Sequence, residues 1–210
     1  MAVLVETENN IQAGPIADQI SAELAALAAR VQGSVVVVRG ARHGAGAGVV
    51  WNGEGLVVTN AHVVPGPRAD IELGRGKVYP AEVVARSNDL DIAALQLTVP
   101  FPSEGWVPAE IGDSAALRPG ELVVAVGHPL GERNAVTLGM VGGAGKITWH
   151  GVAFDTIRLA ITLRPGNSGG ALADIAGRIV GIPNMVVGPG LALAVPSHVV
   201  RRVLRGEARD

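Results

Sequence analysis

Apolar residues near the start of the chain recur at helical spacing, which predicts a helix over residues 16–31. One face of this helix carries Ile16, Ile20, Leu24, Leu27 and Val31. Pro15 suits the first turn, because its missing N–H would have no partner there. The opposite face is not basic, so we expect the helix to pack against the protein and not to lie on a membrane surface.

The hydrophobic pattern changes after residue 33. Short runs rich in Val, Ile, Ala and Leu follow one another, separated by Gly, Pro, Asn and Asp. The pattern predicts strands in a first series at 35–39, 48–51, 56–59, 70–73, 78–86 and 92–97. A second series is predicted at 122–126, 135–148, 154–163, 170–172, 178–182 and 191–195. Many short strands separated by turns are typical of an all-β barrel or sandwich.

Two similar halves follow from this pattern. The proline-rich stretch "VPFPSEGWVP" lies between the two series of strands and has no clear periodicity, which is typical of a linker. We therefore expect an N-terminal segment with a helix (1–32), a first β-unit (33–99), a linker (100–112), a second β-unit (113–196) and a C-terminal helix with a tail (197–210). The closing helix is predicted over residues 197–204, with Ser197 as its cap.

Composition narrows the functional classes. The 210 residues are 48% apolar and 17% charged, which is typical of a globular chain with a sizeable core. A net charge of −2 gives no reason to expect nucleic acid or an anionic membrane as a partner. Cysteine is absent, which excludes disulfides, a zinc-thiolate site and a cysteine nucleophile.

The N-terminal stretch "MAVLVETENN" has no basic region followed by an apolar one, so no signal peptide is visible. The longest apolar runs are too short to span a bilayer as helices. We expect a cytoplasmic protein. The alternative is a secreted or periplasmic protein whose leader has been removed.

Three residues could carry nucleophilic catalysis. Ser168 lies in "LRPGNSGGAL", where three glycines and a proline surround it on a tight bend between strands. His62 lies in "LVVTNAHVV", at the end of a predicted strand, and Asp91 opens the apolar run of "NDLDIAALQL". Each alone is typical of a structural residue. Together, a nucleophile, a base and a group that orients the base make one reaction centre.

Other candidate sites are not supported. His43, His128, His150 and His198 lie in contexts typical of surface or turn residues. "GGAGKIT" lacks two residues of the phosphate-loop pattern, and "HGAGAG" precedes a predicted strand where a dinucleotide site needs a helix. No His, Asp or Glu residues have metal-ligand spacing, so we expect neither a metal nor a cofactor.

The chain resembles the HtrA (Deg) family of trypsin-like serine proteases over roughly residues 31–204. "GLVVTNAHVV" is similar to the histidine motif of that family, "DLDIAALQL" to its aspartate motif and "RPGNSGGAL" to its nucleophile motif. "GAGAGVV", "IGDSAALRPGELVVAVGHPLG" and "LALAVPSHVV" are supporting matches. The resemblance implies two six-stranded antiparallel β-barrels with the active site in the cleft between them.

The resemblance also implies a role for each residue of the triad. Ser168 would attack the scissile carbonyl, and His62 would act as general base and then as general acid. Asp91 would hold the imidazole in the correct tautomer. The backbone N–H groups of Gly166 and Ser168 would form the oxyanion hole.

Departures from related proteases predict the specificity. Thr162 stands six residues before the serine, where trypsin-type pockets have an aspartate, so we expect small or medium aliphatic residues at P1 and not Lys or Arg. Ile182 belongs to the strand expected to pair with substrate, and Leu191 and Leu193 are expected to narrow the pocket. Asn167 replaces the aspartate that pairs with a cleaved N-terminus in digestive proteases, so no activation of that kind is expected.

Further departures concern regulation and assembly. Leu159 and Ala160 replace a polar pair that is usual in the family, and Pro183 removes one donor from the substrate-pairing strand. Members usually continue into a peptide-binding PDZ domain, whereas this sequence ends about six residues after its closing helix. The family forms trimers, but the N-terminal segment lacks the aromatic residues that build them, so the oligomeric state stays open.

The leading hypothesis is a serine endopeptidase that acts on unfolded or exposed polypeptides, as in protein quality control. One alternative is a binding module with the protease fold and a latent site. The other is a hydrolase of small esters that uses the same triad.

Overall fold

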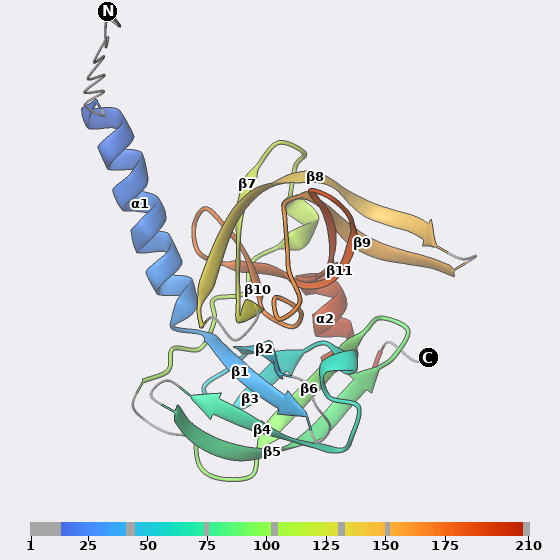
Figure 1. The fold of residues 1–210 in the computed structure, drawn as a ribbon. Coiled ribbons are helices and arrows are strands. Elements are labelled where there is room, and N and C mark those ends of the chain that lie inside the picture. Colours follow the sequence, from blue (N-terminus) through green and yellow to red (C-terminus); the bar gives the residue numbers. More distant parts are fainter. Residues whose placement is uncertain are drawn as a thin grey trace, which may run out of the picture.

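Two closed antiparallel β-barrels of six strands each form the body of the protein. The computed structural model describes residues 14–40, 45–73, 76–101, 105–129, 133–149 and 152–207. The first barrel contains β1 (Val35–Gly40), β2 (Ala45–Val50), β3 (Leu56–Thr59), β4 (Arg68–Leu73), β5 (Lys77–Ser87) and β6 (Ile92–Leu97). The second contains β7 (Leu122–Gly127), β8 (Ala135–Trp149), β9 (Val152–Ala160), β10 (Ala171–Asp174), β11 (Ile179–Gly188) and β12 (Leu191–Pro196). Figure 1 shows them one above the other.

The strand order is the same in both barrels. It runs β1-β2-β3-β6-β5-β4 in the first and β7-β8-β9-β12-β11-β10 in the second, and each ring closes on itself. Because the first and last strands of each order pair with each other, neither barrel has a free edge strand. The expected all-β class with two six-stranded barrels is therefore confirmed.

Three apolar clusters hold this arrangement. Two fill the barrel interiors: Ile71 and Leu95 lie in the first, and Ile157 and Leu172 in the second. The third lies between the barrels and joins residues of both barrels and both helices, for example Val49 with Ile182. Because the barrels share a core, the loops at their junction are fixed relative to one another.

Helix α1 (Pro15–Gln32) confirms the predicted N-terminal helix, but only part of its apolar face packs. Leu27 and Val31 are buried in the core between the barrels. Ile16 is 74% exposed and Ile20 is 55% exposed, because the first half of the helix projects away from the body (Figure 1). The expectation that this whole face packs was wrong for these two residues.

The closing helix α2 (Ser197–Leu204) has the predicted bounds but a different capping residue. Pro196 occupies the N-cap position, so Ser197 does not cap the helix as expected. The Ser197 hydroxyl is buried and donates to the Gly112 carbonyl at 2.8 Å. It therefore fastens the helix to the segment between the barrels.

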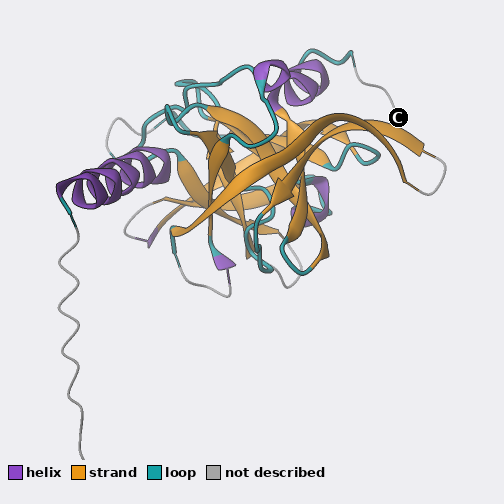
Figure 2. Cartoon of the chain, turned by 90° about the horizontal axis from the view of Figure 1, so that it is seen from above, coloured by secondary structure: helices purple, strands orange, loops and turns teal. Residues whose placement is uncertain are grey.

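Strands β8 and β9 continue as a hairpin beyond the second barrel, which Figure 2 shows from above. No helix in the part of the chain that the structure describes has the length and apolar character to cross a membrane.

Strand β11 runs six residues further than predicted, to Gly188, and register shifts near Pro183 and Val186 accommodate the irregular sequence.

Candidate active site

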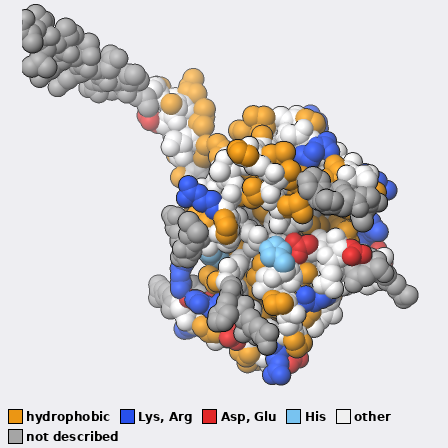
Figure 3. All heavy atoms as spheres, turned by 45° about the vertical axis from the view of Figure 1, so that its right-hand side comes forward, with side chains coloured by type: hydrophobic (Ala, Val, Ile, Leu, Met, Phe, Trp, Pro, Cys, Tyr) orange, Lys and Arg blue, Asp and Glu red, His pale blue; other side chains and the backbone are white. Residues whose placement is uncertain are grey.

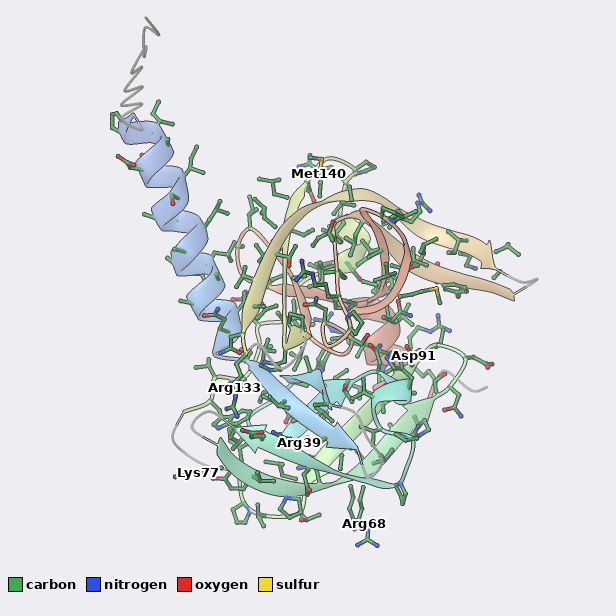
Figure 4. All side chains as sticks on the ribbon, viewed as in Figure 1. Arg39, Arg68, Lys77, Asp91, Arg133 and Met140 are labelled. Carbon is green, nitrogen blue, oxygen red and sulfur yellow. The ribbon has the colours of Figure 1, made fainter. Side chains whose placement is uncertain are left out.

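His62 and Asp91 meet at the junction of the barrels, where Figure 4 labels Asp91. His62 lies on a short 3₁₀ helix, η1 (Ala61–Val63), which Asn60 separates from β3, and Asp91 directly precedes β6. Since β3 and β6 are paired antiparallel strands, the end of one adjoins the start of the other. His62 Nδ1 lies 2.8 Å from Asp91 Oδ2 and 3.0 Å from Oδ1.

The Asp91 carboxylate is held from several sides. The main-chain N–H of His62 donates to Oδ1 at 3.0 Å, in addition to the contact with the ring. The Asn60 side-chain amide donates to the Asp91 carbonyl at 2.9 Å. Asp91 has a φ of +53°, a left-handed conformation that the hydrogen-bonding capacity of aspartate tolerates. These contacts fix both the tautomer and the orientation of the imidazole.

The charge of this pair changes the titration of the histidine. Its hydrogen bond to Asp91 raises the pKa of His62 above its ordinary value, against the opposing effect of burial. The ring itself is half exposed, with its Nδ1 edge turned to the carboxylate. The pair thus presents an oriented base to solvent.

Ser168 follows a tight turn that glycine makes possible. The Asn167 N–H donates to the Arg164 carbonyl at 3.0 Å, with Pro165 second and Gly166 third, and Gly166 has a φ of +101°. These are the features of a type II turn. The N–H groups of Gly166 and Ser168 donate to no other described residue. Within the described residues, two main-chain donors at the serine therefore have no partner.

Contacts across the barrels bring Ser168 to the histidine motif. The Ser168 carbonyl accepts from the Ala47 N–H of β2 at 3.0 Å. A Cβ placed on Gly169 would lie 2.2 Å from Thr59 Oγ1 and 3.2 Å from the Asn60 nitrogen, so the backbone there passes against the end of β3. The Ser168 hydroxyl forms no hydrogen bond with the described part of the chain. The structure thus brings the three predicted residues to one junction.

A cavity of about 480 Å³ opens beside His62. Its walls come from both barrels: the loop at residues 88–91 on one side, and Phe154, Asn184 and Met185 on the other. Figure 3 shows a face of the molecule on which a histidine side chain is exposed next to acidic groups. The cavity is large enough to hold side chains of an extended peptide.

The four predicted specificity residues lie elsewhere. Thr162 is exposed just before the turn, and Ile182 is fully buried in the core between the barrels. Leu193 is buried, whereas Leu191 is 42% exposed at the start of β12. None of the four is among the described residues that line the cavity beside His62. Their contact with substrate stays a prediction.

The remaining histidines differ from expectation in one case. His128 is 7% exposed, not a surface residue, because it follows β7 directly and lies beneath the turn that precedes Ser168. His198 lies on α2 and its Nδ1 is 2.8 Å from Ser114 Oγ. His43 and His150 lie outside the described residues. Within the described ranges, no three His, Asp or Glu side chains gather as a metal site would require.

Sequence reasoning missed the residues that hold this site together. Asn60 is buried and fastens Asp91, and the Pro183 carbonyl accepts from the Gly169 N–H at 3.1 Å. Asn60 lies within the histidine motif "GLVVTNAHVV", two residues before His62, and this position was a usable signal. The sequence singles out Pro183 only for its missing donor, whereas its carbonyl also holds the residue after Ser168.

Comparison with known proteins assigns the chain to a family. Residues 46–182 match the family model described as a trypsin-like peptidase domain. The chain is 36% identical over 170 residues to Serine protease HTRA1B of Danio rerio, and 36% identical over 171 residues to Serine protease Do-like HtrA of Lactobacillus helveticus. These matches cover 79% and 74% of this chain. The chain belongs to the HtrA family of trypsin-like serine proteases.

The structural comparison agrees with that assignment. The solved structure described as HtrA-type protease AlgW with tripeptide has a TM-score of 0.77 and 26% sequence identity, over 87% of this chain and 62% of that one. The chain spans 35% of HTRA1B and 41% of the Lactobacillus protein. The HtrA resemblance read from the three motifs is thereby confirmed.

Proposed function

We propose that this HtrA-family chain is a serine endopeptidase with Ser168 as nucleophile, His62 as base and Asp91 as the group that orients the base. The observation that carries the proposal is the convergence of the His62–Asp91 pair and the turn of Ser168 at one junction. The residue types match the requirements of acyl transfer, in which a weak nucleophile needs an oriented base.

The reaction proceeds in two halves. Ser168 Oγ attacks the scissile carbonyl carbon while His62 Nε2 takes the hydroxyl proton, and the carbonyl π electrons move onto the oxygen. The N–H groups of Gly166 and Ser168 donate to this oxyanion. The C–N bond then breaks, and His62 returns the proton to the leaving amine. Water, activated by the same histidine, hydrolyses the acyl-enzyme and restores Ser168.

Each supporting group contributes to the transition state. Asp91 stabilises the imidazolium that forms when His62 holds the proton. The two backbone donors contribute on the order of 3 kcal/mol each, as measured for comparable donors in other hydrolases. Hydrogen bonds in a free enzyme are often long and tighten when substrate binds, which fits a Ser168 hydroxyl that has no partner among the described residues.

The substrate we propose is an unfolded or exposed polypeptide with a small or medium aliphatic residue at P1. Thr162 supports this preference, because no carboxylate stands at that position to bind a basic side chain. The cavity beside His62 has room for a side chain of an extended peptide, which supports a polypeptide substrate.

The test compares the native chain with Ser168→Ala on unfolded casein, on short peptides ending in Val, Ala, Phe or Arg at P1, and on a small ester. We expect cleavage of casein and of the Val and Ala peptides, and a loss on the order of 10⁴-fold or more in Ser168→Ala. Ser21→Ala, on the exposed part of α1, is the matched control and keeps full activity. Preferred cleavage after Arg contradicts the specificity, and turnover of the ester alone contradicts the peptidase.

A further inference from the structure

The turn that precedes Ser168 rests on the end of β7. The His128 N–H donates to the Gly166 carbonyl at 3.0 Å. A Cβ on Gly166 would lie 2.4 Å from the His128 carbonyl oxygen, and one on Gly127 would lie 2.8 Å from Asn167 Oδ1. No side chain fits between these two segments. The path of residues 127–129 therefore decides where the turn lies.

The imidazole of His128 ties the end of β7 to the residue before β8. Its Nδ1 accepts from the main-chain N–H of Asn134, at 3.0 Å, immediately before β8 begins. An accepting Nδ1 requires a neutral ring with its proton on Nε2. Burial favours that state, since it lowers the pKa of His128. The side chain thus acts as a fixed acceptor inside the protein.

The same connection is tied to α1 and to the first barrel. The Gln32 amide, at the end of α1, donates to the Asn134 carbonyl at 2.8 Å. The neighbouring Arg133 forms an ion pair with Glu72 of β4, which also pairs with Arg39 of β1. Figure 4 labels Arg133 near the foot of α1 and Arg39 on β1. Glu72 is 5% exposed, whereas both arginine side chains are half exposed, so these ion pairs lie at the edge of the protein with only the carboxylate buried.

We propose that His128 is a positioning residue for the oxyanion hole: its imidazole ties residues 128–129 at the end of β7 to residues 133–134 before β8, and its main chain holds the turn so that the Gly166 N–H faces the reacting carbonyl. The inference rests on the proposed role of Gly166. We also propose that α1 and the first barrel help to hold the turn in place, through their contacts with Asn134 and Arg133.

Two substitutions of His128 separate positioning from packing. His128→Asn places a carboxamide oxygen where Nδ1 lies, so it still accepts from Asn134, whereas His128→Leu fills the space without an acceptor. Both keep the main-chain N–H that donates to Gly166. We expect His128→Leu to lower kcat about tenfold with KM within about twofold, because the hole acts on the transition state. His128→Asn should stay within about threefold of the native kcat.

A second measurement does not depend on activity. Amide hydrogen exchange in the full chain should show residues 164–170 exchanging about tenfold faster in His128→Leu, with the other strands of the second barrel unchanged. Arg133→Ala should shift the same segment in the same direction by a smaller factor. Arg68→Ala, on an exposed arginine of β4, is the matched control and should shift nothing.

Several results would overturn the proposal. One is that His128→Leu has the same kcat and the same amide exchange rates as the native chain. Another is that His128→Leu and His128→Asn lose kcat equally. The third is that amide exchange in His128→Leu becomes faster throughout the second barrel. A native chain without turnover refutes the proposed function. In that case the exchange comparison still decides whether His128 fixes the turn.

Discussion

Asp91 Oδ1 contacts His62 twice: it accepts from the main-chain N–H of His62, and it lies 3.0 Å from the ring Nδ1. This arrangement raises the pKa of His62, so the imidazolium is stabilised in the folded protein. By linkage, the stabilisation is fully present below the ordinary histidine pKa and is lost as pH rises through the folded one. Catalysis as a base needs the neutral ring, so activity and this part of stability change in opposite directions with pH.

The first prediction concerns this pH dependence. We expect kcat/KM to rise with pH through a midpoint above about 6.5, the ordinary histidine value, in a pH–rate profile of the native chain. Asp91→Asn should shift the midpoint down and lower kcat on the order of 10⁴-fold, because the wrong tautomer is then favoured. A native midpoint below the ordinary value would contradict the paired geometry.

Individual residues were predictable where their chemistry is carried by a motif. Ser168, His62 and Asp91 stand out because a glycine-flanked serine and polar groups at strand ends are unusual in an apolar sequence. His128 was not predictable, because the sequence around it contains Gly and Pro and gives no sign that a turn some 36 residues later covers it. Its burial depends on the pairing of β7 with β10.

Two glycines around Ser168 are required for different reasons. Gly166 supplies the positive φ of the type II turn. Gly169, with a φ of +79°, also passes against Ala47 and Thr59 of the first barrel, where a Cβ would lie 2.3 Å from the Ala47 carbonyl oxygen. This close approach brings the turn of Ser168 in one barrel to the histidine motif of the other.

A comparison of two glycines tests that approach. Gly169→Ala should lower the free energy of unfolding by about 3 kcal/mol and reduce kcat, because the backbone must move away from β2 and β3. Gly206→Ala has a similar φ of +69° with no atom nearby, so it should cost only about 1 kcal/mol and leave kcat unchanged. Urea unfolding and steady-state kinetics of both variants give the answer. Equal costs would mean that conformation alone, and not contact between barrels, requires Gly169.

Strands were predicted well where hydrophobic runs end at Gly, Pro or Asn. Residues 56–59 and 92–97 form β3 and β6 with the expected bounds. Strand β11 was predicted too short because Pro183 interrupts the pattern, yet a register shift lets the pairing with β12 continue. The exposed half of α1 was missed because a periodic apolar face indicates a helix but not how much of it finds a partner.

The two barrels are joined by a shared apolar core and, at one edge, by a buried carboxylate. Glu72 accepts from Arg39 in its own barrel and from Arg133 in the connection of the second. The hydrogen bond from Arg39 is the main cause that lowers the pKa of Glu72 below its usual range. Its stabilisation is therefore present above the ordinary glutamate pKa and is lost as pH falls through the folded value. Residues so far apart in sequence gave no signal of this cluster.

Glu72→Gln tests this connection between the barrels. At about pH 7 we expect the free energy of unfolding to fall by about 1–3 kcal/mol, near the low end because both arginines are half exposed and can turn to water. The difference from the native chain should shrink as the pH falls below about 4. Glu82→Gln, an exposed carboxylate on β5, should show neither effect in the same denaturation series. A difference that is independent of pH would contradict the ion pair.

The most direct test of the triad is labelling with a fluorophosphonate, which reacts only with a serine that has an oriented base and an oxyanion hole. The proposal predicts that the native chain is labelled at Ser168 and that Ser168→Ala, folded to the same extent, is not labelled. A folded native chain without label, or equal labelling of the two, would contradict an assembled Ser168–His62–Asp91 centre.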